Sequence, residues 1–266
     1  LTGPIEPTPW PTHNYSKNLI SGEWRLTEGQ VRPWLLPPVY ERLRSGQAWF
    51  LDEIRPVAAL FLKFSGLEYD QDNNVSEKLD AYIRWVQSIL ARHQGYLIQL
   101  TTGDKGSYLY AAFGAPTAHE GHIQQSIAAA LELRSPPPEM GFITKVQIGL
   151  STGLMHSGPY GSAIRRTYGV LGNETNMAAL LMDHATNGQI LTTGGVAIPA
   201  SRDYRTEQLP PIQLRDNPEL VPIFEVLGRR WTPEEKLGVE QQPTIIGREA
   251  ERALLTQKLR DLIDAG

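Results

Sequence analysis

The spacing of apolar residues becomes regular from Val57 onward. The run from Val57 to Phe64 is apolar except at Lys63 and is closed by a Ser-Gly pair, which is typical of a strand buried on both faces. Apolar residues then recur at helical spacing between positions 79 and 90, and Gly95 marks the predicted end of that helix. The pattern therefore predicts a buried strand followed by an amphipathic helix.

The periodic pattern continues through the middle of the chain. Two strands, at 96–101 and 107–113, are joined by a Gly-Asp-Lys-Gly turn, and a second amphipathic helix at 119–134 precedes a strand at 144–150. This strand-helix-strand-strand-helix-strand order is that of ferredoxin-like domains. We therefore predict an α+β fold with a ferredoxin-like βαββαβ core. Additional C-terminal elements are expected as strands at 165–170, 189–193, 204–207 and 221–227 and as a helix at 173–185.

Composition shifts divide the chain into four segments. Residues 1–50 form a proline-rich lead-in with one short helix at 38–44, residues 51–230 hold the regular pattern, and residues 231–243 are a polar linker. Residues 244–266 resemble the start of an ATPase module of the AAA or signal-transduction type. The sequence contains no Gly-x-x-x-x-Gly-Lys-Ser/Thr motif, so the phosphate loop of such a module is expected beyond residue 266.

Composition also narrows the classes of function. The net charge of -4 gives no electrostatic reason to expect a nucleic-acid partner. The chain has no cysteine, which excludes disulfides and cysteine-ligated zinc. No apolar run approaches the roughly 20 residues that span a bilayer. Because the sequence begins at Leu1, we expect a piece of a longer cytoplasmic protein that binds neither nucleic acid nor membrane.

Four short motifs carry a family resemblance. A Gly-x₈-Asp-Lys-Gly run covers 95–106, and a Phe-Gly pair follows at 113–114. A Gly-x-x-x-Ser-Gly turn is expected at 153–158, before a Tyr-x-Val-Leu-Gly-x-x-x-Asn block at 168–176. In this order and spacing the motifs resemble the catalytic domains of class III adenylate and guanylate cyclases. The likeness is greatest to the second, C2-type half of the bicarbonate-responsive soluble-type adenylyl cyclases.

The resemblance implies a site that is shared between two halves. In these cyclases two halves face each other, and ATP or GTP lies in the groove between them. One half supplies two aspartates that hold two divalent ions, which activate the attacking hydroxyl and neutralise the triphosphate. The other half supplies a Lys with an Asp or Thr that read the purine, and an Asn and an Arg that orient ribose and stabilise charge at phosphorus.

Carried onto this chain, the two metal positions have lost their carboxylates. The first falls at Lys63 and the second at Ser107, while a shorter alignment places Asp104 at the second. An ammonium group repels the ion that an aspartate would bind. We therefore expect no tightly bound cofactor in this half, with Mg²⁺ or Mn²⁺ and the nucleotide held by the partner half. A His pair at 119 and 122 lacks a third ligand nearby and is expected at the surface.

The nucleotide positions are only partly retained. By the resemblance, the purine-reading Lys becomes Gln99 and its partner becomes Gly169, the Asn is kept as Asn176, and the Arg becomes Leu180. Asn176 has a second interpretation as a helix cap, because Asn is favoured there. Arg165 corresponds to a basic residue near a small-anion pocket, or is simply a solvated strand end.

These losses favour a degenerate cyclase homology domain that pairs with a catalytic half of the same polypeptide and regulates cyclic nucleotide production. The alternative is an active adenylate or guanylate cyclase half with an atypical base site around Gln99 and Asn176. A nucleic-acid-binding ferredoxin-like module is a third reading, which the acidic balance disfavours. A weak homodimer is also compatible with this family.

Overall fold

The computed structural model describes residues 27–47, 52–103, 106–162, 165–214, 217–230 and 257–258. The chain divides into two compact units, Leu1–Gly228 and Arg229–Gly266. The expected linker and ATPase-type module lie outside the described residues, except for a helical pair at 257–258. The domain limits 1–50, 51–230, 231–243 and 244–266 therefore stay predictions.

The first six regular elements of the domain form the ferredoxin-like core. The strands of this core occur in the spatial order β2-β3-β1-β4, and each neighbouring pair is antiparallel. The predicted α+β fold is confirmed. Along the chain the elements are β1 (Glu53–Ser65), α4 (Val75–Arg92), β2 (Gly95–Gly103), β3 (Gly106–Phe113), α5 (His122–Leu133) and β4 (Lys145–Gly161).

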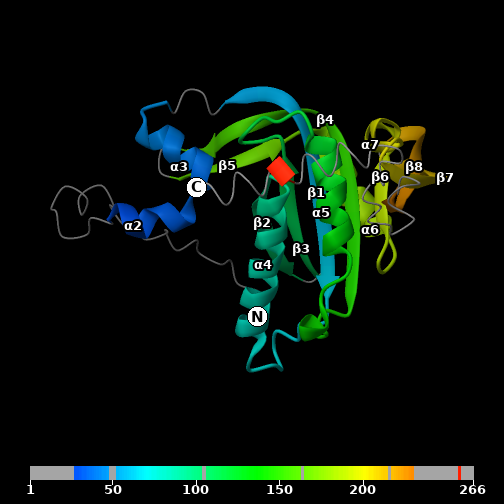
Figure 1. Cartoon of the computed structure of the whole chain (residues 1–266). Coiled ribbons are helices and arrows are strands. Elements are labelled where there is room, and N and C mark those ends of the chain that lie inside the picture. The colour runs from blue at the N-terminus through cyan, green and yellow to red at the C-terminus, as the bar shows by residue number, and fades with distance from the viewer. Residues whose placement is uncertain are drawn as a thin grey trace, which may run out of the picture. The chain divides into compact units, whose positions relative to one another are not determined.

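The C-terminal elements extend the same sheet beyond β4. Strand β6 pairs with β4 in parallel, β8 and β7 follow it in the sheet, and β5 pairs with the far end of β4 (Figure 1). These elements are β5 (Arg166–Leu171), α6 (Asn173–His184), β6 (Ile190–Thr193), α7 (Gly194–Ala200), β7 (Tyr204–Leu214) and β8 (Asn217–Arg229). Helix α7 was not predicted, and β7 is longer than the expected 204–207.

Strand β4 corrects two predictions. It runs from Lys145 to Gly161, whereas the apolar pattern predicts a strand that ends at Leu150. The turn expected at 153–158 is wrong, because these residues pair with the start of β1 and then with β5. Helix α5 likewise begins at His122 and not at 119.

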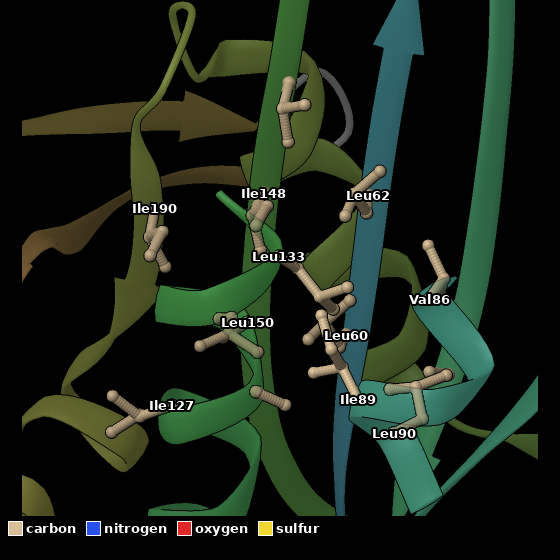
Figure 2. Close-up of a cluster of buried hydrophobic side chains, with 14 of the residues drawn as sticks. Leu60, Leu62, Val86, Ile89, Leu90, Ile127, Leu133, Ile148, Leu150 and Ile190 are labelled. Carbon is tan, nitrogen blue, oxygen red and sulfur yellow. The ribbon is translucent and has the colours of Figure 1, made fainter. Parts of the chain in front are cut away.

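The two faces of the sheet are covered by different helices. Helices α4 and α5 pack together over one face, where Leu60 and Leu62 of β1 meet Ile89 of α4 and Ile127 of α5 (Figures 1 and 2). Helix α6 packs on the opposite face, where it contacts β4 and β1 and contributes Ala178 and Met182 to a second buried cluster. The second face of the sheet is therefore the one that carries α6.

Helix α6 approaches β4 closely along a track of small residues. A Cβ on Gly149 would overlap the carbonyl oxygen of Ala178 and the amide nitrogen of Met182, and would lie 3.0 Å from Cβ of Leu181. Two residues further along the same face, the Ser151 hydroxyl donates a hydrogen bond to Glu174 of α6. The backbone of α6 can rest on β4 at this depth only because position 149 has no side chain.

The described part of the lead-in docks on the domain. It comprises α2 (Glu28–Val31), a 3₁₀ turn η1 (Arg32–Trp34) and α3 (Pro37–Arg44), which confirms the predicted short helix. Arg42 of α3 donates to the carbonyl of Pro116 at 3.3 Å and forms an ion pair with Glu53 at 3.6 Å. None of the helices in the described ranges has the length and apolar character needed to cross a membrane.

The close contact at Gly149 is testable by substitution. Gly149→Ala is expected to lower the free energy of unfolding by about 1–3 kcal/mol, because the added methyl group must push α6 away from β4. Gly29→Ala is the matched control, since a Cβ at Gly29 meets nothing within 4 Å. Urea denaturation of both variants measures the effect. Equal stabilities for Gly149→Ala and the unchanged protein would contradict the described packing of α6.

Candidate functional site

The candidate site lies on the face of the sheet that carries α6, called here the α6 face. In the strand register, Lys63 of β1 lies opposite Tyr108 of β3, and Gln99 of β2 lies opposite Tyr110. Phe61 stacks on Tyr110 with ring centroids 4.7 Å apart. Because directly paired residues share a face, Lys63 and Gln99 both lie on the α6 face.

Lys63 is paired with a carboxylate that the sequence interpretation missed. Its Nζ lies 3.0 Å from Oδ1 of Asp183, on the last turn of α6. The side chain of Lys63 is 24% exposed and runs past Gly106, where a Cβ would lie 3.5 Å from its Cε. The ammonium neutralises Asp183 and opposes the approach of a divalent cation. The sequence could have indicated Asp183, because it lies seven residues after Asn176 and hence on the same side of the predicted helix.

Ser107 does not join Lys63. It lies opposite Phe64 in the register, so its side chain points to the face covered by α4. Its hydroxyl is 2.5 Å from the hydroxyl of Tyr69, and the residue is only 4% exposed. The structure therefore separates the two expected metal positions on opposite faces. Asp104, the position favoured by the shorter alignment, lies outside the described residues.

Other acidic and histidine side chains do not gather into a metal site. Within the described ranges, no group of three His, Asp or Glu residues is placed to hold an ion. The rings of His119 and His122 are 6.5 Å apart, and burial lowers the pKa of His122. Both histidines are half-buried and do not lie at the surface as expected, and in the described part of the chain neither belongs to a group of three possible ligands.

Two predicted positions and Asp183, found in the structure, share the outer side of α6. Asn176, Leu180 and Asp183 are spaced by four and three residues, and all three are exposed. Helix α6 begins at Asn173 after Gly172, so the interpretation of Asn176 as a cap is wrong. Asn176 is therefore the fourth residue of the helix, and its side chain is exposed. Leu180, 39% exposed, presents an apolar side chain one turn later.

The two expected base-reading positions are both occupied by contacts within the chain. The Gln99 side-chain amide donates to the Thr101 hydroxyl at 3.1 Å. Gly169 of β5 pairs with Gly158 of β4, and a Cβ on Gly169 would overlap the ring of the neighbouring Tyr160. The Tyr160 ring therefore covers the strand where a purine-reading side chain would stand.

A buried tyrosine fixes β5 against the sheet. The hydroxyl of Tyr110 donates to the carbonyl of Val170 at 3.0 Å, and burial raises the pKa of Tyr110. Burial also raises the pKa of Tyr168, against the opposing effect of nearby Arg55. Both phenols therefore stay protonated at neutral pH, so Tyr110 keeps the proton that it donates to β5.

Arg165 lies at the solvent end of β5. It is exposed, and its backbone N–H donates to the hydroxyl of Ser162 at 3.4 Å. The next residue, Arg166, lines a cavity together with residues of the lead-in. The basic residue that lines a cavity at this end of β5 is therefore Arg166, one residue after the predicted Arg165.

The chain is similar in sequence to nucleotide cyclases. The family model described as the adenylate and guanylate cyclase catalytic domain matches residues 55–221, which is more than half of the chain. Adenylate cyclase type 10 of Rattus norvegicus is 25% identical over 183 residues, covering 67% of this chain and 11% of that protein. This chain therefore spans about a tenth of the length of that curated relative.

Two solved structures share the fold. The adenylyl cyclase CyaB from P. aeruginosa superposes with a TM-score of 0.61 at 18% identity, covering 67% of this chain and 97% of that chain. A dimeric guanylyl cyclase domain of the RhoGC fusion protein from Blastocladiella emersonii has a TM-score of 0.58 at 16% identity, with 67% and 99% covered.

The cover of Gly169 by Tyr160 is testable with a double-mutant cycle. Gly169→Ala should destabilise the domain, and Tyr160→Ala should remove that penalty, giving a coupling energy of at least about 0.5 kcal/mol. Gly195→Ala is the matched control, because the nearest atoms to a Cβ there lie at an ordinary 3.6 Å. Urea denaturation of the four proteins gives the coupling. Additive effects at Gly169 and Tyr160 would show that the ring does not lie over the strand.

Proposed function

This chain belongs to the adenylate and guanylate cyclase catalytic-domain family, and we propose that it is a degenerate half that pairs with a catalytic half and regulates it. The observation that carries the proposal is the Lys63–Asp183 ion pair on the α6 face. Two free carboxylates are needed to hold the divalent ions of this reaction, and here an ammonium group occupies one position and neutralises the nearest acid. Mg²⁺ or Mn²⁺, with the nucleotide, would therefore be held by the partner half.

Charge stabilisation at phosphorus is also missing from the proposed half. Leu180 stands where the resemblance requires an arginine, and its exposed side chain offers no hydrogen-bond donor. Loss of one such donor typically lowers the rate by about 10²–10³. Asn176 is retained and exposed on the same side of α6, so a ribose contact survives without the charge stabiliser.

Base reading is weakened in the same way. The Tyr160 ring occupies the space over Gly169, and the side-chain amide of Gln99 donates a hydrogen bond to the hydroxyl of Thr101. A purine edge could be read at either position only after the contact there was displaced. The proposed half therefore forms one wall of the shared groove, but discriminates little between ATP and GTP.

The partner is proposed to be a complementary cyclase half in the same polypeptide. The chain spans about a tenth of a cyclase relative, which leaves room for a second half. Leu180 of α6 is 39% exposed on the α6 face, and exposed apolar side chains of this kind are buried in the core of protein interfaces. The dimeric fungal cyclase domain of the same fold supports pairing, and weak self-association is expected through the same face.

A second candidate function is an active cyclase half with an atypical base site. Asn176 favours this second function, because its side chain is exposed on α6 and could contact a ribose. In that case Gln99 would exchange its bond to Thr101 for the purine edge. The following experiment separates the two functions.

Repair of the groove tests the proposal. The variant Leu180→Arg, Gln99→Lys, Gly169→Thr, Tyr160→Ala is mixed with a metal-competent half of a related cyclase, and cyclic nucleotide is measured in Mn²⁺ with ATP or GTP. Activity should rise on the order of 10²-fold over the unaltered chain, mostly through Leu180→Arg, which acts on the transition state. Tyr160→Ala belongs in the set because the ring would otherwise block Gly169→Thr.

Two controls decide between the candidates. Lys63→Asp alone should leave the mixture unchanged, because the metals would sit on the other half. The unaltered chain by itself should form no cyclic nucleotide. Metal-dependent turnover by the pure chain would instead support the active half, and gain from Lys63→Asp without gain from the repaired variant would overturn the assignment to the non-metal half.

A further inference from the structure

A cavity lies between the lead-in and the cyclase domain, away from the groove positions on α6. Its volume is about 730 Å³, within the range of small-molecule sites, which typically measure roughly 300–1,000 Å³. One wall comes from η1 and α3, and the other from β2, the end of β4 and the start of β5. All of these elements belong to the first compact unit.

The body of the cavity is apolar and aromatic. Leu36 and Val39 of the lead-in face Leu97 and Ile98 of β2 across it. An adjoining cavity of about 410 Å³ shares Leu36 and Leu97 in its wall and extends the apolar surface toward α4. Trp34, 87% exposed, and the half-buried Tyr168 add two rings to the lining of the first cavity. Flat apolar groups pack well on surfaces of this kind.

The charge of the lining has one sign. Arg32 of η1 and Arg166 of β5 both line the cavity, and no aspartate or glutamate does. Neither arginine forms an ion pair within the described ranges, although the Arg32 guanidinium lies 5.7 Å from the ring centroid of Tyr40. Arg32 and Arg166 therefore give opposite walls of this mainly apolar space a positive charge, which favours an anionic headgroup on an apolar body. Arg32 also lines a separate, smaller cavity together with Glu28 and Glu41.

We propose that this cavity binds an amphipathic organic anion, an aromatic or apolar carboxylate or sulfonate whose head lies between Arg32 and Arg166. Such a ligand would connect the lead-in to β5, since Arg166 and Tyr168 lie on that strand three residues and one residue before Gly169. Binding would fix the lead-in on the strand that carries the base-reading position. The site is independent of whether the domain is degenerate or active.

The probe for this test is anilinonaphthalene sulfonate, titrated against the full chain by its fluorescence. Its uncharged analogue, N-phenylnaphthylamine, has the same aromatic body without the anion. The unaltered protein should bind the sulfonate at least about fivefold more tightly than the uncharged analogue, because the charge-assisted contacts are lost with the anion. Equal affinity, or no saturable binding of the sulfonate, overturns the proposal without requiring any variant.

Variants locate the site. The double variant Arg32→Gln, Arg166→Gln should weaken sulfonate binding at least about fivefold and leave the uncharged analogue unaffected. Arg205→Gln is the matched control, since Arg205 is exposed on β7 and does not line the cavity. Thr167→Trp, at an exposed position of the lining, should fill the cavity and abolish binding of both probes. A smaller loss in the double variant, an equal loss in Arg205→Gln, or unchanged binding to Thr167→Trp would each overturn the proposal.

Discussion

The seating of α6 on β4 is the constraint on which the candidate site depends. A helix backbone reaches a sheet this closely only over residues without side chains, and Gly149 supplies that gap beneath Ala178. The buried Gln147 side chain donates to the carbonyls of Met182 and Ala185, and thus holds the C-terminal end of the same helix. Together these contacts set the height and direction of α6, and hence the position of every side chain it presents to the groove.

The Lys63–Asp183 pair matters for chemistry more than for stability. Exposed ion pairs contribute about 0–1 kcal/mol, and Asp183 is 59% exposed, so the fold does not need this contact. On the proposed assignment, its effect is to place a cation at a position where the family reaction needs a carboxylate for divalent ions. By the same assignment, Leu180, one turn before Asp183, replaces the cation that would stabilise the departing charge. The chain therefore keeps the cyclase fold, and the proposed degeneracy lies in its charged positions.

Much of the fold could be predicted because each core element has its own periodicity. The strand at 57–64 and the helix at 79–90 were identified from apolar spacing, and the structure confirms both within β1 and α4. The length of β4 could not be read in this way, since its second half has partners on β1 and β5 that local pattern does not reveal. Gly95 is a further example: it begins β2 and does not end α4, because a Cβ there would lie 2.5 Å from the Phe113 ring.

The site was less predictable than the fold for a physical reason. Counting along a strand gives a position but not its face, and a single-residue difference in register turns a side chain to the other side of the sheet. Ser107 therefore lies under α4 while Lys63 lies beside α6. Asp183 and Tyr160 were missed because their roles come from contacts with residues that are distant in sequence or across a hairpin.

Electron paramagnetic resonance of Mn²⁺ shows whether Asp183 is free to bind a divalent ion. The full chain is titrated with Mn²⁺, with and without a non-hydrolysable nucleotide triphosphate, and compared with Asp183→Asn. Because Lys63 neutralises the nearest carboxylate, the account predicts no saturable site in this chain below millimolar Mn²⁺, and no difference between the two proteins. Tight Mn²⁺ binding by the unaltered chain that is lost in Asp183→Asn would show that Asp183 is a metal ligand, and would contradict the account.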